Sequence, residues 1–371
     1  MISYWEKVSF LNYDYVIVGG GIVGFSTALS LRDNYPKASI LVLESGFLPS
    51  GASTKNAGFA CVGSLSEIIE DLRTHTEDEV CELVKLRKDG LELLKKRLGE
   101  NRIGYQGYGS HELIFHHELH LLEHIEKINT LLGNIYAVPI FEERAQDISS
   151  FGFSSEVKTT IYNRAEGSIH TGKMMKNLIS KAQSLGIEYK TRSQVVTLDE
   201  DNTGVLVHIK DEEGRIRANK VFICTNAFSK TLLPELDLKP GRGQVLLTKP
   251  IPGLSLKGTF HFDQGYYYFR EIDGRILFGG GRNIDFINEE STLDELNGKI
   301  QHDLEHKLRH LILPGYKVAI DQRWTGIMAF GSQKKPIVQV ISPRIFAGVR
   351  LGGMGVAIGS QLGEILAGFA D

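Results

Sequence analysis

Cysteine is scarce in this sequence. The 371 residues contain three cysteines, Cys61, Cys81 and Cys224, and no Cys-x-x-Cys pair. An odd and sparse set of cysteines is typical of a reducing compartment and speaks against a disulfide framework. The chain is long enough for two domains, and its 42% hydrophobic and 23% charged residues are typical of a soluble globular protein.

A surplus of positive charge and a long apolar run are also missing. With 42 basic and 45 acidic residues the formal net charge is -3, so nothing predicts binding to nucleic acid or to an anionic membrane. No apolar run approaches the length of a membrane span. Residues 1–7 carry neither the basic nor the apolar stretch of a secretion signal. We therefore expect a cytoplasmic protein with no membrane span and no nucleic-acid partner.

A strand, a glycine turn and a helix stand near the start of the chain. Residues 15–18, Tyr-Val-Ile-Val, predict a buried parallel strand, and residues 25–32 predict a helix. Between them lies Gly19-x-Gly21-x-x-Gly24. In such a motif the glycines permit a tight turn, close approach of a pyrophosphate and close helix packing, and the helix N-terminus faces the phosphates.

A second predicted strand gives this glycine motif its context. Residues 39–44, Ser-Ile-Leu-Val-Leu-Glu, end at Glu44, twenty residues past Gly24. A ribose-binding carboxylate is expected at that distance. An ordinary βαβ unit with a glycine turn is the alternative, but the full pattern favours a dinucleotide site.

A small polar stretch follows at residues 51–58, Gly-Ala-Ser-Thr-Lys-Asn-Ala-Gly. Such a backbone can wrap closely around a ligand, although a surface turn is the alternative. The order of fingerprint, Glu44 and this loop resembles the FAD-dependent oxidoreductases of the D-amino-acid oxidase, glycine oxidase and sarcosine oxidase family. In that family the equivalent loop lies against the flavin and the pyrophosphate.

The resemblance implies FAD as cofactor and a role for later segments. A strand at Val195-Val196 would touch the adenine, although plain strand core is the alternative. Residues 225–227 would pass the phosphates, and a glycine turn at 352–355 would lie at the flavin pyrimidine, before a helix whose N-terminus aims at it. The implied cofactor-binding residues are Gly19, Gly21, Ile22, Val23, Gly24, Glu44, Ser45, Ala52, Ser53, Thr54, Asn56, Ala57, Gly58, Val195, Val196, Thr225, Asn226, Ala227, Trp324, Gly326, Arg350, Gly352, Gly353, Met354 and Gly355.

The predicted fold class is α/β: a Rossmann-like FAD-binding domain of a GR2-type flavoprotein, interleaved with a mixed-sheet α+β substrate domain. We expect the FAD-binding domain over residues 12–75, 155–240 and 320–371, and the substrate domain over 76–154 and 241–319. Residues 1–13 are expected to pack on the core. Amphipathic helices are predicted over residues 80–98, 118–132 and 289–313.

A hairpin in the second domain carries the candidate substrate residues. Two predicted strands, 266–271 and 275–282, flank Asp273-Gly274, a strong hairpin signal. In the family, this sheet roofs the substrate over the flavin. Strand alternation puts Tyr266, Tyr268 and Arg270 on one face, which we favour, and Tyr267 and Phe269 on the other.

Two departures from the family bear on the substrate. Members that oxidise glycine or D-amino acids often clamp the substrate carboxylate with an arginine in a Gly-x-Arg-Pro stretch, whereas residues 326–330 here read Gly-Ile-Met-Ala-Phe. Arg270, Arg323 or Arg350 could replace that arginine, or the substrate lacks an α-carboxylate. Sarcosine-oxidase-type members link flavin to a late cysteine; no cysteine follows Cys224, so we predict non-covalent FAD.

The resemblance implies oxidation of the CH–NH bond of a small amine or amino acid, with hydride passing to flavin N5 and electrons then to O2 or another acceptor. Hydride transfer from a neutral amine needs orientation more than a protein base. The pattern, with Ser3-Tyr4-Trp5 and residues 225–227, is similar to γ-glutamylputrescine oxidases, which favours an amine. A 2-hydroxy-acid dehydrogenase with a base near the hydroxyl, and a non-catalytic FAD-binding protein, are the alternatives.

Histidines spaced by four form two rows, His116, His120 and His124, and His302, His306 and His310. A histidine pair of this spacing on one helical face can bind zinc. A solvated polar face is the alternative, and no Cys or carboxylate set completes a site. We predict no metal.

Overall fold

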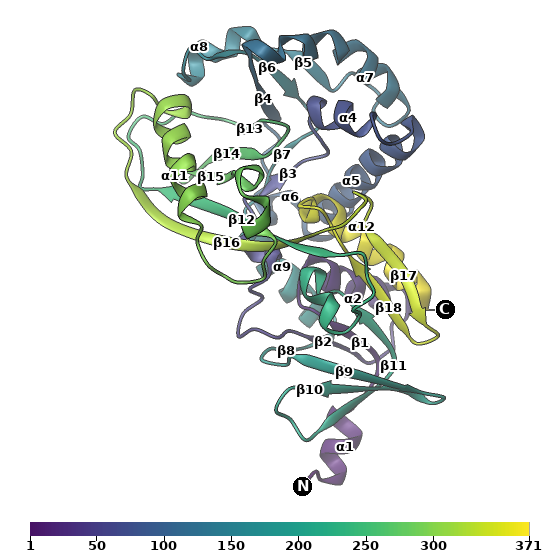
Figure 1. The fold of residues 1–371 in the computed structure, drawn as a ribbon. Helices are drawn as coiled ribbons and strands as arrows, with labels where there is room; N and C mark the ends of the chain where they lie inside the picture. The colour runs from purple at the N-terminus through teal and green to yellow at the C-terminus, as the bar shows by residue number, and fades with distance from the viewer. Residues whose placement is uncertain (371) are drawn as a thin grey trace.

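The computed structural model describes residues 1–370, which form two eight-stranded sheets and one two-stranded sheet (Figure 1). The first sheet has the order β17-β18-β11-β1-β2-β8, extended by β10 and β9 beside β11. Its strands are β1 (Asn12–Val18), β2 (Ile40–Leu43), β8 (Glu188–Lys190), β9 (Val195–Asp201), β10 (Gly204–Ile209), β11 (Arg215–Ile223), β17 (Ile337–Ser342) and β18 (Ile345–Val349).

The centre of the first sheet is parallel because helices cover the strands. β1 pairs in parallel with β2 and β11, and β18 pairs in parallel with β11. Strands buried on both faces must be apolar throughout, and all four residues of β2 are buried. The helices α2, α5 and α12 share one hydrophobic core on one side of these strands, and the β9–β10 hairpin packs on the other side.

The second sheet lies above the first in Figure 1 and has the order β16-β12-β15-β14-β13-β4-β6-β5. A core rich in phenylalanine lies between its outer face and α11. Its strands are β4 (Ser110–Phe115), β5 (Phe141–Glu143), β6 (Val157–Asn163), β12 (Lys239–Thr248), β13 (Thr259–Phe262), β14 (Tyr267–Ile272), β15 (Arg275–Gly280) and β16 (Ile320–Phe330); the small sheet pairs β3 (Phe59–Ala60) with β7 (Gly167–Ser168).

The helices connect and cover these sheets. The α-helices are α1 (Tyr4–Phe10), α2 (Ile22–Asn34), α3 (Ala52–Lys55), α4 (Leu65–Asp71), α5 (Glu77–Leu98), α6 (Glu100–Ile103), α7 (Ile125–Leu131), α8 (Ile148–Phe151), α9 (Thr171–Ser184), α10 (Phe286–Glu289), α11 (Gly298–Lys307) and α12 (Gly355–Ala367). The 3-10 helices are η1 (His116–His124), η2 (Leu132–Asn134), η3 (Ala145–Asp147), η4 (Asn226–Thr231), η5 (Arg282–Ile284) and η7 (Gly368–Ala370), and η6 (Leu308–Ile312) is a π-helix.

Three elements, β6, β16 and α5, pack with the other structural unit than the one predicted for their segments. β6 and β16, which lie in segments expected for the FAD-binding domain, belong to the second sheet. β16 does so because it pairs with β12 along almost its whole length. α5, expected in the substrate domain, packs on α12, because its Leu91, Leu94 and Leu98 belong to the core that α2 and α12 share.

Two of the predicted helices are interrupted. The helix predicted over residues 289–313 is wrong: α10 ends at Glu289, residues 290–297 are irregular, and the Asn297 side chain caps α11 by accepting a hydrogen bond from the Lys299 N–H. The Glu289 carboxylate, at the last residue of α10, is bound from outside the helix by Arg242 and Gln244. Residues 116–124 form a 3-10 helix before α7 begins.

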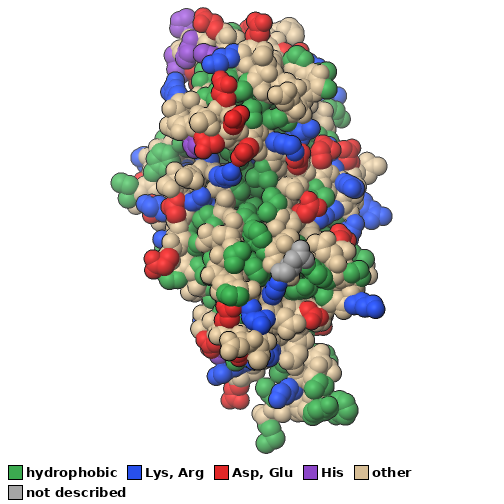
Figure 2. All heavy atoms as spheres, turned by 90° about the vertical axis from the view of Figure 1, so that its right-hand side faces the viewer, with side chains coloured by type: hydrophobic (Ala, Val, Ile, Leu, Met, Phe, Trp, Pro, Cys, Tyr) green, Lys and Arg blue, Asp and Glu red, His purple; other side chains and the backbone are tan. Residues whose placement is uncertain are grey.

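The N-terminal segment does not pack on the core as expected. α1 buries none of its residues, and Trp5 and Phe10 are exposed. In Figure 2, hydrophobic side chains gather at the lower end of the molecule, where α1 projects. No helix within residues 1–370 is long and apolar enough to cross a membrane.

Candidate active site

The turn between β1 and α2 has the geometry that the glycine fingerprint predicts. Gly19 has a φ of +112°, where side chains are disfavoured. A Cβ on Gly24 would lie 1.9 Å from the Gly19 carbonyl oxygen, so only glycine fits there. The Ile22 N–H, in the first turn of α2, donates to Ser53 Oγ at 3.0 Å. The turn, α2 and the loop at residues 51–58 therefore meet at one point.

Glu44 lies beside this turn at the end of β2. Its carboxylate accepts hydrogen bonds from the Gly20 N–H at 3.1 Å and from the Gly46 N–H at 2.8 Å. The Ser193 N–H donates to the Glu44 carbonyl at 2.8 Å, which brings the start of β9 and Val195 alongside. The Tyr189 hydroxyl is buried without a partner in the described part of the chain, and burial and Glu44 raise the pKa of Tyr189 to about 12.

The loop at residues 51–58 is shaped by Asn56. Its amide group donates to the carbonyls of Ala52 and Ser53. Its side-chain oxygen accepts hydrogen bonds from the Gly58 N–H and from Thr171 Oγ1, each at 2.9 Å. The Asn56 side chain therefore holds the loop in a fixed curve, while Ala57 and Gly58 follow at its end.

The C-terminal glycine turn lies next to this loop. Met354 precedes α12, and its sulfur lies 3.5 Å from Cys61 Sγ. Gly352 and Gly353 have positive φ, so the chain reverses directly before the helix. The N-terminus of α12, which carries unpaired N–H groups and a partial positive charge, therefore points at the space beside residues 51–61.

Arg350 and residues 225–227 hold the adjoining backbone. The Arg350 N–H donates to Asn226 Oδ1 at 3.1 Å, and both residues have positive φ. The Arg350 guanidinium donates to Asp237 Oδ2 at 2.7 Å and to the Lys335 carbonyl. Thr225 Oγ1 lies 2.8 Å from Ser229 Oγ. Arg350 is thus engaged in an ion pair away from any open substrate position.

The strand β14 presents two of its predicted residues to the loop. The Tyr268 ring lies edge-on to Phe59, with centroids 5.5 Å apart. Arg270 Nη1 donates to the carbonyls of Gly58 at 3.0 Å and Ile169 at 2.8 Å. Tyr267 and Phe269 point the other way and stack on Phe262 and Phe260. Tyr266 precedes the strand, and its ring packs on Phe286 instead.

β16 brings its own side chains to the same face. Trp324 Nε1 donates to the Lys55 carbonyl at 2.9 Å. The register sets Gly326 opposite Gly243 and Met328 opposite Gly241. The Met328 sulfur lies 3.5 Å from the position that a Cβ on Gly353 would take. Met328 therefore occupies the place near the glycine turn where the family resemblance suggests a clamping arginine.

Two of the three arginines that could replace the missing carboxylate-binding arginine form ion pairs with other residues. Arg323 donates to Gln301 Oε1 at 2.5 Å and pairs with Glu305, and Arg350 pairs with Asp237. Arg270 has no carboxylate within ion-pair distance among residues 1–370, but it is tied to backbone carbonyls. Burial lowers the pKa of Arg270 to about 10.

Arg282, which sequence reasoning missed, is a guanidinium without an acidic partner in the region that the structure describes. Its guanidinium carbon lies 3.9 Å from the centre of the Phe330 ring and 4.9 Å from that of Phe286. One of its terminal nitrogens lies 3.3 Å from the position that a Cβ on Gly241 would take. Burial lowers the pKa of Arg282. Arg282 thus lies beside the face that carries Tyr268 and Met328, because Gly241 and Gly243 of β12 lie next to all three side chains.

His261, also missed, lies on the other side of Tyr268. It is directly opposite Tyr268 on β14 and opposite Glu112 on β4. Its Nδ1 is buried, with no hydrogen-bond partner from residues 1–370, and burial lowers the pKa of His261 although Glu166 and Glu67 oppose the shift. His261 lies in no sequence motif, so only the strand pairing shows that it is beside Tyr268 and Glu112.

In the described residues, neither histidine row comes together with further metal-ligating side chains. The rings of His306 and His310 lie 4.4 Å apart. No group of three metal-ligating side chains in the described region is arranged to hold a metal ion.

The donor set fits a dinucleotide: an acidic residue at the end of β2, a glycine turn that side chains would fill, and two helix N-termini aimed at one region. The structure brings the glycine fingerprint, Glu44 and Ser53 together at the β1–α2 turn, and Val196, Thr54 and Ala227 lie in adjoining segments. That the predicted residues bind FAD stays a prediction. The side chains of Val195 and Tyr266 and the guanidinium of Arg350 point elsewhere, and Val195 packs in the buried core with Val16 and Leu41.

Comparisons with known proteins agree with this geometry. The chain is 27% identical over 306 residues to an L-2-hydroxyglutarate dehydrogenase of Escherichia coli O17:K52:H18, an alignment that covers 75% of this chain and 65% of that relative. The chain therefore spans less than two thirds of the length of the curated relatives it matches.

Solved structures resemble it over nearly the whole chain. Glycine oxidase from Geobacillus kaustophilus superposes with a TM-score of 0.78 at 18% identity and covers 97% of this chain and 95% of its own. L-Proline dehydrogenase from P. horikoshii does so with a TM-score of 0.78 at 18% identity, covering 96% and 92%. At this identity the likeness concerns the fold.

The family profile decides the assignment. The profile described as "DAO: FAD dependent oxidoreductase" matches residues 14–368, which include both sheets and every segment of the candidate site. The chain belongs to this family of FAD-dependent oxidoreductases.

Proposed function

We propose that this protein oxidises the CH–NH bond of a small amino acid or amine, with non-covalently bound FAD. FAD, when bound, supplies the electron-pair acceptor for the hydride that leaves the substrate carbon. Glu44 would hold the adenosine ribose, and the turn at residues 19–24 with the N-terminus of α2 would hold the pyrophosphate. The turn at residues 352–355 and the N-terminus of α12 would face the oxygen-bearing edge of the flavin.

The observation that carries the substrate class is the position of Arg282. A guanidinium stacked between two phenylalanines, without an acidic partner in the described residues, is suited to a carboxylate. Arg282 lies beside the face that includes Met328 and Tyr268. It would take over the role of the missing family arginine. This favours an amino acid over an amine without a carboxylate.

The remaining side chains would orient the substrate and exclude water. Phe59 and Tyr268 form an aromatic pair, and Trp324 is fixed by its bond to the Lys55 carbonyl. Burial raises the pKa of Tyr268 to about 12, so its hydroxyl stays protonated and can donate to a substrate oxygen. Hydride transfer from a neutral amine depends on orientation more than on a protein base.

A 2-hydroxy-acid dehydrogenase is the second candidate. It is supported by the named function of the curated relatives, L-2-hydroxyglutarate dehydrogenase. His261 would be its base, because a lowered pKa keeps the ring neutral at pH 7 and able to accept the hydroxyl proton. β14 and β15 separate His261 on β13 from Gly241 on β12, which the Arg282 guanidinium of η5 approaches. The carboxylate partner and the base would therefore be far apart for a small substrate.

Three broader expectations remain proposals. The domain division predicted above is one, with β6, β16 and α5 reassigned. The electron acceptor, O2 or another compound, is the second. A cytoplasmic location is the third, supported by three free thiols.

The test is anaerobic bleaching of the flavin absorbance by matched substrate sets. Each set contains an amino acid, the amine without its carboxylate, and the corresponding 2-hydroxy acid. Bleaching by amino acids at lower concentrations than by the amines supports the proposal. Bleaching only by hydroxy acids supports the second candidate, and bleaching by none contradicts both.

The role of Arg282 is tested in the same assay. Arg282→Met should raise the half-saturating concentration of the amino acid about tenfold or more, as expected for loss of a charge-assisted pair, and leave that of the amine unchanged. Arg275→Met is the matched control, because Arg275 begins β15, the strand directly before Arg282, but pairs with Asp321. Equal effects on amino acid and amine would contradict the assignment.

A further inference from the structure

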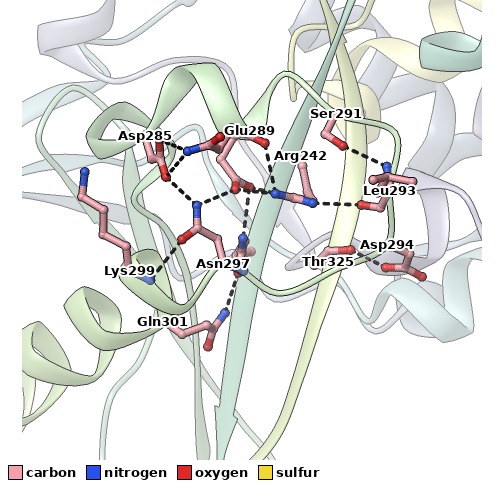
Figure 3. Close-up of polar contacts among 12 residues, drawn as sticks. Arg242, Asp285, Glu289, Ser291, Leu293, Asp294, Asn297, Lys299, Gln301 and Thr325 are labelled. Atoms are coloured by element: carbon pink, nitrogen blue, oxygen red, sulfur yellow. Dashed lines mark hydrogen bonds and ion pairs between the residues drawn. The ribbon is translucent and has the colours of Figure 1, made fainter.

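Residues 290–297 form an irregular segment that crosses the edge of the second sheet. They join α10 to α11, and most of their side chains are exposed, including Leu293 and Leu296. Figure 3 shows the segment passing over β12 and β16, with Asp294 beside Thr325. β16 is the terminal strand of its sheet. We call residues 290–297 the strap.

The two ends of the strap are anchored by a buried polar network. Glu289 is fully buried and accepts hydrogen bonds from Arg242 Nε at 3.0 Å and Nη2 at 2.8 Å. Asn297 Nδ2 donates to the same carboxylate at 2.9 Å, and the Asn297 N–H donates to Gln244 Oε1 at 3.0 Å. Both ends of the strap are thus fixed to one strand, β12.

The middle of the strap is held by weaker contacts. Arg242 Nη1 donates to the Leu293 carbonyl at 3.2 Å. Asp294 Oδ1 accepts a hydrogen bond from Thr325 Oγ1 on β16. Asp294 Oδ2 pairs with Lys55 Nζ at 2.7 Å, and the Asp294 side chain is 63% exposed. An exposed pair of this kind is screened by salt and breaks readily.

Lys55 connects the strap to the cofactor loop. It is the last residue of α3, in the stretch 51–58 that carries Ser53 and Asn56. Its carbonyl accepts the Trp324 indole N–H at 2.9 Å, while its ammonium binds Asp294. Lys55 is therefore held from both sides of the edge strand, by Trp324 on one and by the strap on the other.

We propose that Asp294 is a positioning residue for FAD: through Lys55, the strap holds the cofactor loop closed against β16 and slows the exchange of FAD. The proposal rests on membership of the FAD-dependent family and not on the identity of the substrate. Asp294 reaches the cofactor only through Lys55, because its other bond is to Thr325. Opening the strap needs only the loss of surface contacts, whereas its anchors at Glu289 and Asn297 stay in place.

The experiment measures release of FAD from the purified holoprotein. The holoprotein is diluted until released FAD no longer rebinds, and the rise of free-FAD fluorescence gives the dissociation rate. Asp294→Asn keeps the bond to Thr325 and removes the charge. We expect it to release FAD about three to five times faster than the wild type, the effect of losing an exposed ion pair.

Two variants make the comparison specific. Asp321→Asn is the matched control, because Asp321 also lies on the β16 side of the sheet and also forms a partly exposed ion pair, with Arg275. It should leave the release rate unchanged. Lys55→Met should accelerate release to a similar degree as Asp294→Asn, and the double variant should be no faster than either single one.

The dependence of the FAD release rate on salt is a second readout, because a purely structural defect would not change with salt concentration in this way. The difference between the wild type and Asp294→Asn should shrink as NaCl rises from 50 mM to 1 M, because the pair is screened. Equal release from wild type and Asp294→Asn, equal acceleration by Asp321→Asn, or additive effects in the double variant would each overturn the proposal. Failure of the amino-acid oxidation assay would leave these release rates unaffected.

Discussion

Replacing Glu289 by glutamine tests the buried network under the strap. Glu289 is fully buried and Arg242 nearly so, and they form a bidentate ion pair with contacts of 3.0 and 2.8 Å. The carboxylate also accepts bonds from Gln244 and Asn297. Glutamine keeps the shape but removes the charge, and it places an NH2 group where one of these donors points. Arg242 would then be buried without a counterion.

The size of the effect follows from the burial. Breaking a buried ion pair on one side costs about 3–5 kcal/mol, because the remaining charge stays out of water. We expect Glu289→Gln to lower the free energy of unfolding by about 3 kcal/mol. With a urea m-value of about 3 kcal/mol per M, the unfolding midpoint should fall by about 1 M.

The neighbouring residue supplies the control. Glu290 pairs with Lys239 at 3.2 Å, and the two side chains are 47% and 65% exposed. An exposed pair is worth at most about 1 kcal/mol, so Glu290→Gln should shift the midpoint by less than about 0.3 M. The assay is urea unfolding followed by the fluorescence of Trp324, which lies on the adjoining strand. Equal midpoints for the two variants would refute the reasoning.

The pH dependence of the free energy of unfolding should reveal the contribution of the Glu289–Arg242 ion pair. Burial acts to raise the pKa of Glu289, but the hydrogen bonds from Arg242, Gln244 and Asn297 outweigh it, so the pKa is lowered. A depressed pKa in the folded state stabilises the protein above the ordinary carboxyl pKa of about 4.3, and this stabilisation is lost as the pH falls through the lowered value. The Glu289→Gln variant should lack that part of the acid sensitivity, which urea midpoints at pH 3 to 6 measure.

Three further predictions concern the cofactor and the reaction. Gly24→Ala should abolish FAD binding, because its Cβ would meet the Gly19 carbonyl, whereas Gly51→Ala, with open space at that position, should bind normally; the ratio of absorbance at 450 nm to that at 280 nm reports both. Cys61→Ser should release its flavin on acid precipitation just as the wild type does, because we propose non-covalent FAD; flavin retained by the wild-type pellet alone would contradict this. His261→Asn should leave the pH profile of flavin reduction by an amino acid unchanged and should remove an ionisation from reduction by a hydroxy acid, which stopped-flow bleaching between pH 5 and 9 would resolve.

The glycine turns and the acid at residue 44 could be predicted from the sequence because short segments of the chain largely specify their backbone conformation. The fingerprint at residues 19–24 and the acid at residue 44 belong to one βαβ unit, and a Cβ on Gly24 would meet the Gly19 carbonyl within that unit. A Cβ on Gly19 or Gly21 would instead meet Cys224 or Ser53, which are further away in the sequence. The loop at residues 51–58 and the turn at 352–355 likewise carry their conformation in their own glycines and short side chains. Such segments specify a cofactor site because their backbone geometry depends on few distant contacts.

The partners of individual side chains were decided by the tertiary structure. Strand pairing between segments far apart in the chain placed His261 opposite Tyr268 and Glu112, and it stacked Arg282 on Phe330. The same packing tied Arg323 and Arg350 to carboxylates. A guanidinium is free or occupied according to which acid lies within about 4 Å, and sequence patterns do not contain that distance.

The helix predicted over residues 289–313 shows the same division. Its hydrophobic spacing is helical, but α10 ends at Glu289, residues 290–297 are irregular, and Arg242 from a strand 47 residues earlier binds the Glu289 carboxylate. The sequence by itself thus determined the family, the cofactor and the turns that we propose bind it, because these depend mainly on local backbone geometry. The tertiary structure alone decided which side chains lie on the proposed substrate face and how the strap is anchored, because these depend on contacts between distant segments.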